Sequence, residues 1–395
     1  MKYREFRFMK LTAWAALMAG LLILGCDPPP GPKTIDILSA LSRGGSPEDC
    51  YALADRPGSI KFPGDLGPHP SFKTEWWYYT GNLVDASGRP FGFQLTFFRN
   101  ALDCSDPEGT SSWRFRQLYF AHFAITDIKN KSFYSAQRMN RGSVGLAGAQ
   151  SVPFRVWIDD WSAVQSGSSP DRLTLKAGER TAAKGESIQK KITLHLNLIR
   201  TKPAILQGKN GWSQKGPGPS DASYYYSFPG MKAEGSISLD QEEFRVSGRV
   251  WFDHEWSTSA LGENVRGWDW FALHLTQGPL AGTDLMVCQV RQEDGRPNGF
   301  GFGSISFTDG QWIPLTEDQF AITPKSVWTS PLSKKKYPDQ WSITIPGRDM
   351  AFEVKTRVPD QEHPHDFSYY EGAVQVMGQT GSGTGYVEMT GYEAR

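Results

Sequence analysis

The feature that most constrains this chain is a repeated alternation of apolar and polar side chains. Phe91, Phe93 and Leu95 alternate with Gly92 and Gln94, and the runs at 192–198 and 244–252 follow the same pattern. Because successive side chains of a strand point to opposite faces, a period of two predicts strands with one buried face. Clusters of turn-forming residues separate these runs, and the one short helix we expect lies at 34–43. The pattern therefore predicts an all-β fold of antiparallel barrels or sandwiches.

The length of the chain indicates more than one such unit. Its 395 residues are enough for two ordinary domains. A candidate boundary lies at 231–235, just after the aromatic cluster of Tyr224, Tyr225 and Tyr226. We therefore expect two packed antiparallel β-barrels, the first over residues 60–230 and the second over residues 231–395. A barrel of about eight strands has room for one small molecule, and many Trp and Tyr side chains suit an apolar ligand with a polar handle.

Charge and motif content exclude several classes of protein. The 42 basic and 42 acidic residues balance, whereas a general nucleic-acid binder needs a basic excess. The sequence contains no G-x-S-x-G elbow, Cys-x-x-Cys pair, P-loop or dinucleotide fingerprint. His363 and His365 are weak evidence for a metal site because they are only two histidines in a loop. We therefore predict no nucleic-acid partner, no metal and no organic cofactor.

The N-terminus has the composition of an export signal. Basic residues within the first ten positions precede an apolar run at 11–24, which ends in Leu24-Gly25-Cys26. The run is shorter than a membrane span of about 20 residues, and a Cys directly after Leu-Gly resembles a bacterial lipobox. We expect residues 1–25 to be a signal peptide, Cys26 to be lipidated, and residues 26–59 to form a tether and N-terminal extension. An ordinary signal peptide and an uncleaved anchor are the alternatives.

Export sets the expected location and the redox state of the cysteines. An anchored lipoprotein faces the periplasm or the cell exterior, and Asp27 after the lipidated Cys favours retention at the inner membrane in some bacteria. In an oxidising compartment, Cys50 and Cys104 are candidates for a disulfide. Cys288 lies within an apolar run and is expected to be a buried thiol.

A first cluster at 75–79 places a carboxylate among aromatic side chains. On a strand, Glu75 and Trp77 share one face, and Trp76 and Tyr78 share the other. A carboxylate beside tryptophans loses water, which raises its pKa. The plainer interpretation is a barrel strand with a Glu at its rim, and we favour it on the residues alone.

A second cluster at 251–256 combines a histidine with two carboxylates. His254 and Trp256 face one way on a strand, whereas Asp253 and Glu255 face the other. Histidine is the natural proton shuttle near neutral pH, and a buried Asp can serve as a general acid. A structural hydrogen-bonded His–carboxylate pair explains these residues equally well.

A third cluster at 267–274 is rich in tryptophan. Trp268, Trp270 and His274 share one face, and Asp269 lies on the other. Because the faces of tryptophan rings attract positive charge, such a wall could stabilise a carbocation. Ordinary packing in a core is the alternative.

Several of these motifs together resemble a known family. His69-Pro70 and the runs at 75–81 and 92–99 are similar to the AttH-type lipocalin-like family, which is related to carotenoid 1,2-hydratase, also called hydroxyneurosporene synthase. Further matches lie at 121–127, 224–227, 253–256, 267–270, 370–374 and 385–392. The resemblance covers roughly residues 60–395. Many secreted members of this family are called predicted hydrolases.

The resemblance implies two consecutive lipocalin-like barrels with a pocket where they meet. Carotenoid hydratases add water to a terminal isoprenoid double bond without a metal or organic cofactor. Their site includes a His-x-Trp pair, which matches His254 and Trp256, and a downstream Asp, which we place at Asp269. The chain departs from the hydratase pattern by having Glu255 within the pair and by its exported N-terminus. Both departures argue against carotenoid hydration itself.

We expect a cofactor-free hydratase that adds water to a C=C bond of an isoprenoid or lipid-like molecule. Protonating an alkene requires a neutral acid in an apolar pocket, and the resulting cation requires aromatic faces. We assign Asp269 or Asp253 as the acid and His254 as the base that positions water. The residues expected to contact the substrate are Trp256, Trp268, Trp270, Glu75, Trp77 and Tyr78.

Two other functions fit the same residues. A tethered barrel could carry a lipid or another apolar molecule near the membrane without catalysis and serve an export system. Hydrolysis of an ester or lactone ranks below both, because the sequence shows no evident nucleophile.

Overall fold

The computed structural model of this chain describes residues 50–58, 60–102, 104, 116–218, 220–259, 261, 264–364 and 369–393. The predicted signal peptide, the lipidation site Cys26, the helix expected at 34–43 and His365 lie outside these residues. In the described part of the chain, no helix is long and apolar enough to cross a membrane.

Thirteen strands of the described chain form a first antiparallel sheet. Its order is β4-β3-β2-β1-β13-β12-β9-β8-β7-β6-β5, and β10 and β11 pair with β12. These strands are β1 (Thr74–Asp85), β2 (Pro90–Ala101), β3 (Gln117–Asp127), β4 (Ser132–Asn140), β5 (Ala147–Gln150), β6 (Arg155–Ile158), β7 (Trp161–Gln165), β8 (Arg172–Ala182), β9 (Gln189–Ile199), β10 (Ile205–Leu206), β11 (Trp212–Gln214), β12 (Ala222–Leu239) and β13 (Glu242–Ser259). The short 3₁₀ turn η1 (Gly64–Leu66) lies before β1, and a second, η2 (Ser143–Gly145), lies between β4 and β5.

Nine further strands of the described chain form a second antiparallel sheet, in the order β17-β16-β15-β14-β22-β21-β20-β19-β18. They are β14 (Val265–Gln277), β15 (Asp284–Gln292), β16 (Phe302–Ser306), β17 (Trp312–Thr316), β18 (Ala321–Thr329), β19 (Lys336–Ile345), β20 (Met350–Thr356), β21 (Tyr370–Met377) and β22 (Ser382–Met389). The 3₁₀ turns η3 (Glu317–Gln319) and η4 (Pro346–Arg348) connect parts of this sheet.

Each sheet curls around an apolar interior of its own. In the first sheet, the edge strand β4 curls back to the end of β8. Just after β8, the backbone N–H of Lys184 donates to the carbonyl of Phe133 on β4 at 2.9 Å. The alternating residues predicted from the sequence, 91–97 and 192–198, fill this interior. Phe271, Leu273 and Trp341 belong to the separate interior of the second sheet. The two curled sheets confirm the prediction of an all-β chain with two barrel-like halves, consistent with the lipocalin-like fold that the resemblance implied.

The change of sheet does not coincide with the boundary expected at 231–235. The strand β12 continues through these residues and pairs with β9 and β13. The turn-like sequence before them is an irregularity inside the strand, with a register shift between Phe228 and Met231 and a φ of +55° at Gly230. The chain passes to the second sheet only between β13 and β14, after Ser259 and before Val265.

The cysteine predictions are confirmed. Cys50 and Cys104 form a disulfide, which ties the segment before β1 to the connection between β2 and β3. Cys288 is a buried thiol on β15.

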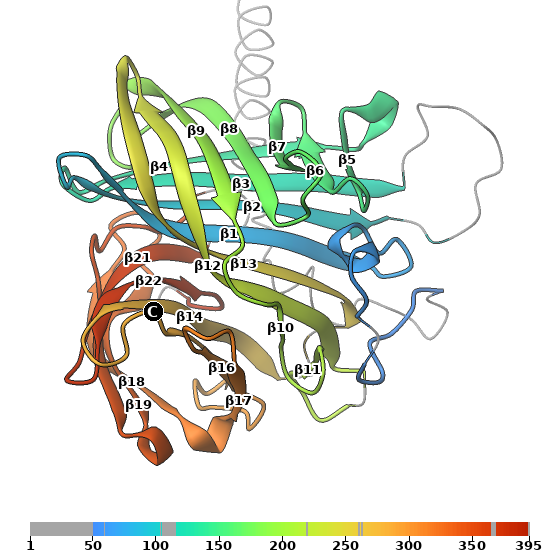
Figure 1. Cartoon of the computed structure of the whole chain (residues 1–395), viewed down its shortest axis with the longest axis vertical. Helices are drawn as coiled ribbons and strands as arrows, with labels where there is room; N and C mark the ends of the chain where they lie inside the picture. The colour runs from blue at the N-terminus through green and yellow to red at the C-terminus, as the bar shows by residue number, and fades with distance from the viewer. Residues whose placement is uncertain are drawn as a thin grey trace, which may run out of the picture. The chain divides into compact units, whose positions relative to one another are not determined.

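The two halves share a buried interface. The side-chain amide of Asn82 on β1 donates to the carbonyl of Gly385 on β22 at 2.8 Å, and Gln207 donates to the Ser304 hydroxyl at 3.2 Å. Figure 1 shows β14 and β22 beside β12 and β13 at this interface. Side chains from both halves form a third apolar cluster here, distinct from the two interiors. Strands β1 and β13 therefore have two buried faces, one toward the first interior and one toward the second half.

Candidate functional site

A cavity lies between the two halves, and we call it the chamber. Its walls are mostly aromatic and apolar, with several carboxyl groups among them. The lining residues are Trp76, Tyr78, Thr96, Phe98, Lys215, Tyr225, Asp253, Glu255, Leu261, Trp268, Trp270, Cys288, Val290, Phe302, Tyr369, Glu371 and Glu388.

The alternation of the strands places these side chains. Trp76 and Tyr78 on β1 lie opposite Glu255 and Asp253 on β13, and all four side chains line the chamber. On the second half, Trp270 on β14 lies opposite Glu388 on β22. The chamber therefore has one wall from each sheet.

Asp253 is a buried acid in the first wall. Its carboxyl accepts hydrogen bonds from the Tyr225 hydroxyl at 2.6 Å, the Ser227 hydroxyl at 2.5 Å and the Trp251 indole N–H at 2.7 Å. Burial disfavours the charged form more than these hydrogen bonds favour it, and the pKa of Asp253 rises to about 7. The Trp270 indole N–H donates to the Tyr225 hydroxyl at 3.2 Å and so links this acid to the second wall.

Two glutamates form a carboxyl pair in the second wall. Glu371 on β21 and Glu388 on β22 are cross-strand partners, so their side chains leave the sheet next to each other. The Tyr78 hydroxyl, from the first half, donates to Glu371 at 2.7 Å.

The surroundings of this pair favour its neutral form. Burial, followed by the nearby Asp253 and Glu255 carboxyls, raises the pKa of Glu388 to about 8. Burial, followed by Glu388, raises the pKa of Glu371 well above its ordinary value. Glu388 is partly exposed, whereas Glu371, which also lines the chamber, is fully buried. Glu371 and Glu388 are therefore mostly protonated near neutral pH.

A buried ion pair lies in the same chamber. The ammonium of Lys215, which follows β11, contacts the carboxylate of Glu255 and the hydroxyl of Ser223, the latter at 2.6 Å. Lys215 is 7% exposed. A fixed cation and anion thus adjoin the neutral acids.

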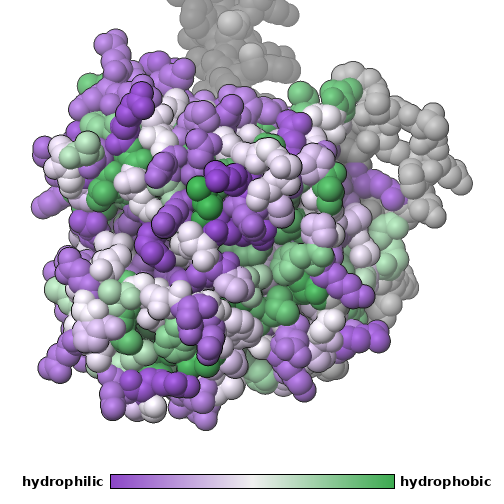
Figure 2. All heavy atoms as spheres, viewed as in Figure 1, coloured by the Kyte–Doolittle hydropathy of each residue, from purple (hydrophilic) through white to green (hydrophobic). Residues whose placement is uncertain are grey.

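An open groove adjoins the chamber. It is lined by the segment around β10 and β11 and by parts of β16, β17 and β18, with Trp212, Phe300 and Phe320 among its apolar side chains. Phe302 lines both the groove and the chamber. Figure 2 shows apolar side chains gathered on this face, over the part where Figure 1 draws β10 and β13.

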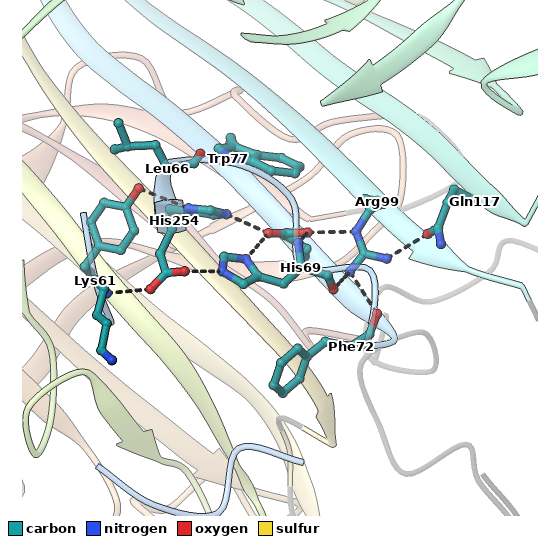
Figure 3. A network of polar contacts seen from close by, with 11 residues as sticks. Lys61, Leu66, His69, Phe72, Trp77, Arg99, Gln117 and His254 are labelled. Atoms are coloured by element: carbon teal, nitrogen blue, oxygen red, sulfur yellow. Dashed lines mark hydrogen bonds and ion pairs between the residues drawn. The ribbon is translucent and has the colours of Figure 1, made fainter. Parts of the chain in front are cut away.

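His254 does not line the chamber. Its side chain points into the first interior, where Nε2 lies 2.8 Å from Glu75 Oε1 and Nδ1 lies 3.1 Å from the Tyr226 hydroxyl (Figure 3). Burial lowers the pKa of His254 to about 4. The neutral ring therefore donates from Nε2 to Glu75 and accepts at Nδ1 from Tyr226. Trp77 and Trp256, also predicted to contact substrate, pack against this ring.

Glu75 is the centre of this network. Its carboxylate accepts hydrogen bonds from the His69 ring at 2.7 Å, the His69 backbone N–H at 2.9 Å and the Arg99 guanidinium at 2.7 Å, besides the one from His254 (Figure 3). Ligand atoms of His69, Glu75 and His254 lie within 4.8 Å of one another, a spacing that an ion could occupy. Because Arg99 already neutralises Glu75 and both carboxylate oxygens accept hydrogen bonds, the residues fit an ion-pair network better than a metal centre.

Asp269 also lies away from the chamber. It shares the face of β14 that carries Phe271 toward the second interior, opposite Trp268 and Trp270. Its carboxyl lies 3.3 Å from Arg291 Nε and accepts a hydrogen bond from the Tyr392 hydroxyl at 3.0 Å. Burial raises the pKa of Asp269.

The structure thus divides the predicted site residues among three places. Asp253, Trp268, Trp270 and Tyr78 meet in the chamber. Glu75, Trp77, His254 and Trp256 belong to the first interior, and Asp269 to the end of the second.

Sequence reasoning missed Glu371, Glu388 and Lys215. The two glutamates carried a detectable signal, because each is a lone carboxylate within an apolar and aromatic strand. Lys215 carried none, since its segment has a loop-like composition and its partner Glu255 is 40 residues away in sequence.

Comparison with known proteins places these features in context. The AttH-like family model matches residues 53–392. The crystal structure of an AttH-type protein from Nitrosomonas europaea is 31% identical, with a TM-score of 0.74, and the match covers 87% of this chain and 100% of that one. A curated relative, the dehydratase asqC of Emericella nidulans, is 21% identical over 332 residues, which is 76% of this chain and 89% of the relative.

A further solved structure shares the fold. Kievitone hydratase from Nectria haematococca has a TM-score of 0.62 and 15% identity, and the match covers 86% of this chain and 98% of that one.

Proposed function

This chain belongs to the AttH-like family, and from that premise we propose that it is a hydratase or dehydratase, a lyase that makes or breaks a carbon–oxygen bond. Its substrate is an apolar unsaturated molecule, or the corresponding alcohol, bound in the chamber. The dehydratase asqC supports this reaction class. The reaction needs no cofactor in this proposal, because the chamber has acids of its own.

The observation that carries the proposal is the set of neutral carboxyl groups in an aromatic chamber. Adding water to an alkene, or removing it from an alcohol, requires a proton donor at neutral pH. Carboxyls have this capacity only where their surroundings raise the pKa, as burial does for Asp253 and Glu388. Trp268 and Trp270 supply ring faces for positive charge that develops on the substrate.

The roles of the residues follow from their positions. Asp253 and the Glu371–Glu388 pair are the proton donors in this proposal, in place of Asp269, which does not line the chamber. His254 loses the role of base that the sequence suggested, because it points away from the chamber.

Site-directed variants test this assignment. The mature protein is incubated in ¹⁸O-labelled water with an acyclic carotenoid and with a prenylated phenol, and mass spectrometry detects gain or loss of water. We expect Asp253→Asn and Glu388→Gln to lower turnover by about a hundredfold or more. Glu353→Gln, at an exposed position on β20, serves as the matched control. Turnover that is unchanged in both chamber variants would refute the assignment of the acids.

Binding without catalysis is the second candidate function, because the aromatic lining serves a bound apolar molecule equally well. Native mass spectrometry of gently purified protein separates the two. A co-purified apolar ligand that the protein never converts favours a carrier, whereas its hydrated or dehydrated form favours the lyase.

The location of the protein is part of the proposal. We propose an exported lipoprotein anchored through Cys26, with the folded halves in the periplasm or outside the cell. The disulfide between Cys50 and Cys104 supports this location, since such bonds persist in oxidising compartments.

A further inference from the structure

Lys215 is a buried ammonium group that the proposed chemistry has not used. Its Nζ donates to the Ser223 hydroxyl at 2.6 Å and to Glu255, and it lies 3.5 Å from the Ser213 hydroxyl. An ammonium has three protons. The contact with Ser213 is at the outer limit of hydrogen bonding, so one proton is held weakly and is available to another acceptor.

The position of this ammonium is fixed by its backbone. The N–H of Lys215 donates to the carbonyl of Asp221 at 2.8 Å, and the Asn298 side chain donates to the carbonyl of Lys215 at 2.9 Å. The rings of Tyr225 and Phe302 lie 5.5 Å and 5.4 Å from Nζ, measured to their centroids. The charge is therefore held in place at the wall of the chamber.

A structural role alone accounts poorly for this pair. Burying an ammonium and a carboxylate usually costs more than packing apolar residues of similar size. The surrounding wall is aromatic and would accept such residues. The pair also faces the cavity, where its charge meets whatever the chamber contains. An oxygen atom on the bound molecule would complete the hydrogen bonds of the ammonium.

We propose that Lys215 binds a carbonyl oxygen of the substrate, and that the substrate is a β-hydroxy ketone or the enone formed from it by loss of water. This inference rests on the proposed function and deepens it by naming the substrate class. The ammonium polarises the carbonyl, so the chemistry is elimination next to a carbonyl and avoids a free carbocation.

The reaction balances with the groups present. In the dehydration direction, the Glu255 carboxylate takes the proton from the carbon next to the carbonyl. The electrons of that C–H bond form an enolate, whose oxygen Lys215 stabilises. The enolate then re-forms the carbonyl as the C–O bond to the β-hydroxyl breaks. The leaving hydroxyl takes a proton from the Glu388 carboxyl and departs as water. A proton then moves from Glu255 to Glu388, which restores the initial protonation state of both residues.

Three small probes test this substrate class. They are benzylideneacetone, the β-hydroxy ketone formed by adding water to it, and a matched benzylic alcohol in which a methylene replaces the carbonyl. We expect the protein to dehydrate the hydroxy ketone at least about tenfold faster than the matched alcohol, because a hydrogen bond from a charged donor is strong. We also expect the absorption of benzylideneacetone to shift to longer wavelength on binding.

The variants separate recognition from chemistry. Lys215→Met should lose both the rate preference and the absorption shift. Glu255→Gln should lose turnover but keep the shift, because the ammonium remains. Lys232→Met, at an exposed position on β12 outside the chamber and the groove, is the control and should behave like the unaltered protein. Since Lys215→Met leaves Glu255 unpaired, the double variant Lys215→Met/Glu255→Gln removes both charges together, and it should fold and lack the shift.

The outcomes distinguish this inference from the proposed function. Two results would overturn the carbonyl assignment: equal dehydration of both alcohols, or an absorption shift that persists in Lys215→Met and in the double variant. Neither result would contradict the proposed hydratase or dehydratase activity. If the unaltered protein dehydrates neither alcohol, and none of the substrates offered above gains or loses water, the lyase itself is refuted. Loss of the preference and of the shift in Lys215→Met, with both retained in Lys232→Met, supports the inference.

Discussion

Replacing Glu388 with Gln removes one titrating group from the chamber and leaves its size unchanged. In the folded protein the pKa of Glu388 is about 8, against an ordinary value of 4.5. The folded state holds this proton more tightly than the unfolded chain does, so protonated Glu388 contributes to the free energy of unfolding. This contribution is complete below pH 4.5. That contribution is lost as the pH rises through about 8.

The size of the effect follows from the difference between the two pKa values. Each unit corresponds to about 1.4 kcal/mol, so the complete loss is about 5 kcal/mol. The Glu388 side chain is partly exposed, which reduces the penalty for its charged form. We therefore expect Glu388 to lower the free energy of unfolding by about 2 to 4 kcal/mol between pH 5 and pH 9.

Urea unfolding followed by tryptophan fluorescence measures this difference. The unaltered protein and Glu388→Gln are unfolded at pH 5 and at pH 9. Relative to the unaltered protein, the variant should gain about 2 to 4 kcal/mol between the two pH values, since its amide does not titrate. The exposed substitution Glu353→Gln should show no such gain. Parallel pH dependence of the unaltered protein and Glu388→Gln would refute the claim that Glu388 is neutral in the folded chamber.

Three further predictions concern other parts of the chain. Glu75→Gln leaves Arg99 without its buried partner, which lies 2.7 Å away, and should lower the free energy of urea unfolding by about 3 to 5 kcal/mol; a loss below about 1 kcal/mol would contradict this. Cys50→Ser opens a disulfide with Cys104 across a sequence separation of 54 residues and should cost about 4 kcal/mol in the same assay, whereas an unchanged urea midpoint would show that the bond contributes nothing. Cys26→Ser should abolish labelling by an alkyne fatty acid in cells, and labelling that persists would exclude Cys26 as the lipidated residue.

Much of the fold could be predicted because alternation is a local property of the chain. The period of two separates Glu75 from Tyr78 on one strand and His254 from Asp253 on the other, and the structure confirms both separations. The expected site was inconsistent with it, because it combined residues from opposite faces of each strand, such as His254 with Asp253 and Asp269 with Trp268. Two residues that are adjacent on a strand point to opposite faces and cannot contact the same small molecule.

The rest of the chamber depends on contacts between distant segments. Glu371 pairs with Tyr78 across 293 positions of sequence, and Lys215 meets Glu255 across 40. Nothing local to either residue indicates its partner. The boundary expected at 231–235, after the aromatic cluster at 224–226, does not coincide with the change of sheet for a related reason. Only the pairing of β12 with β9 and β13 shows that one strand runs through these residues.

Strand β13 has side chains of different function on its two faces, and this limits how its sequence can change. Inserting or deleting one residue near position 253 would shift the following residues by one place and exchange the sets that the two faces present. The imidazole and indole side chains of β13 would then face the chamber, and its carboxylates would enter the first interior. Arg99 could not balance these carboxylates, because it already pairs with Glu75. We therefore expect natural variation in this strand to consist of substitutions, with changes in length confined to the connections at its ends.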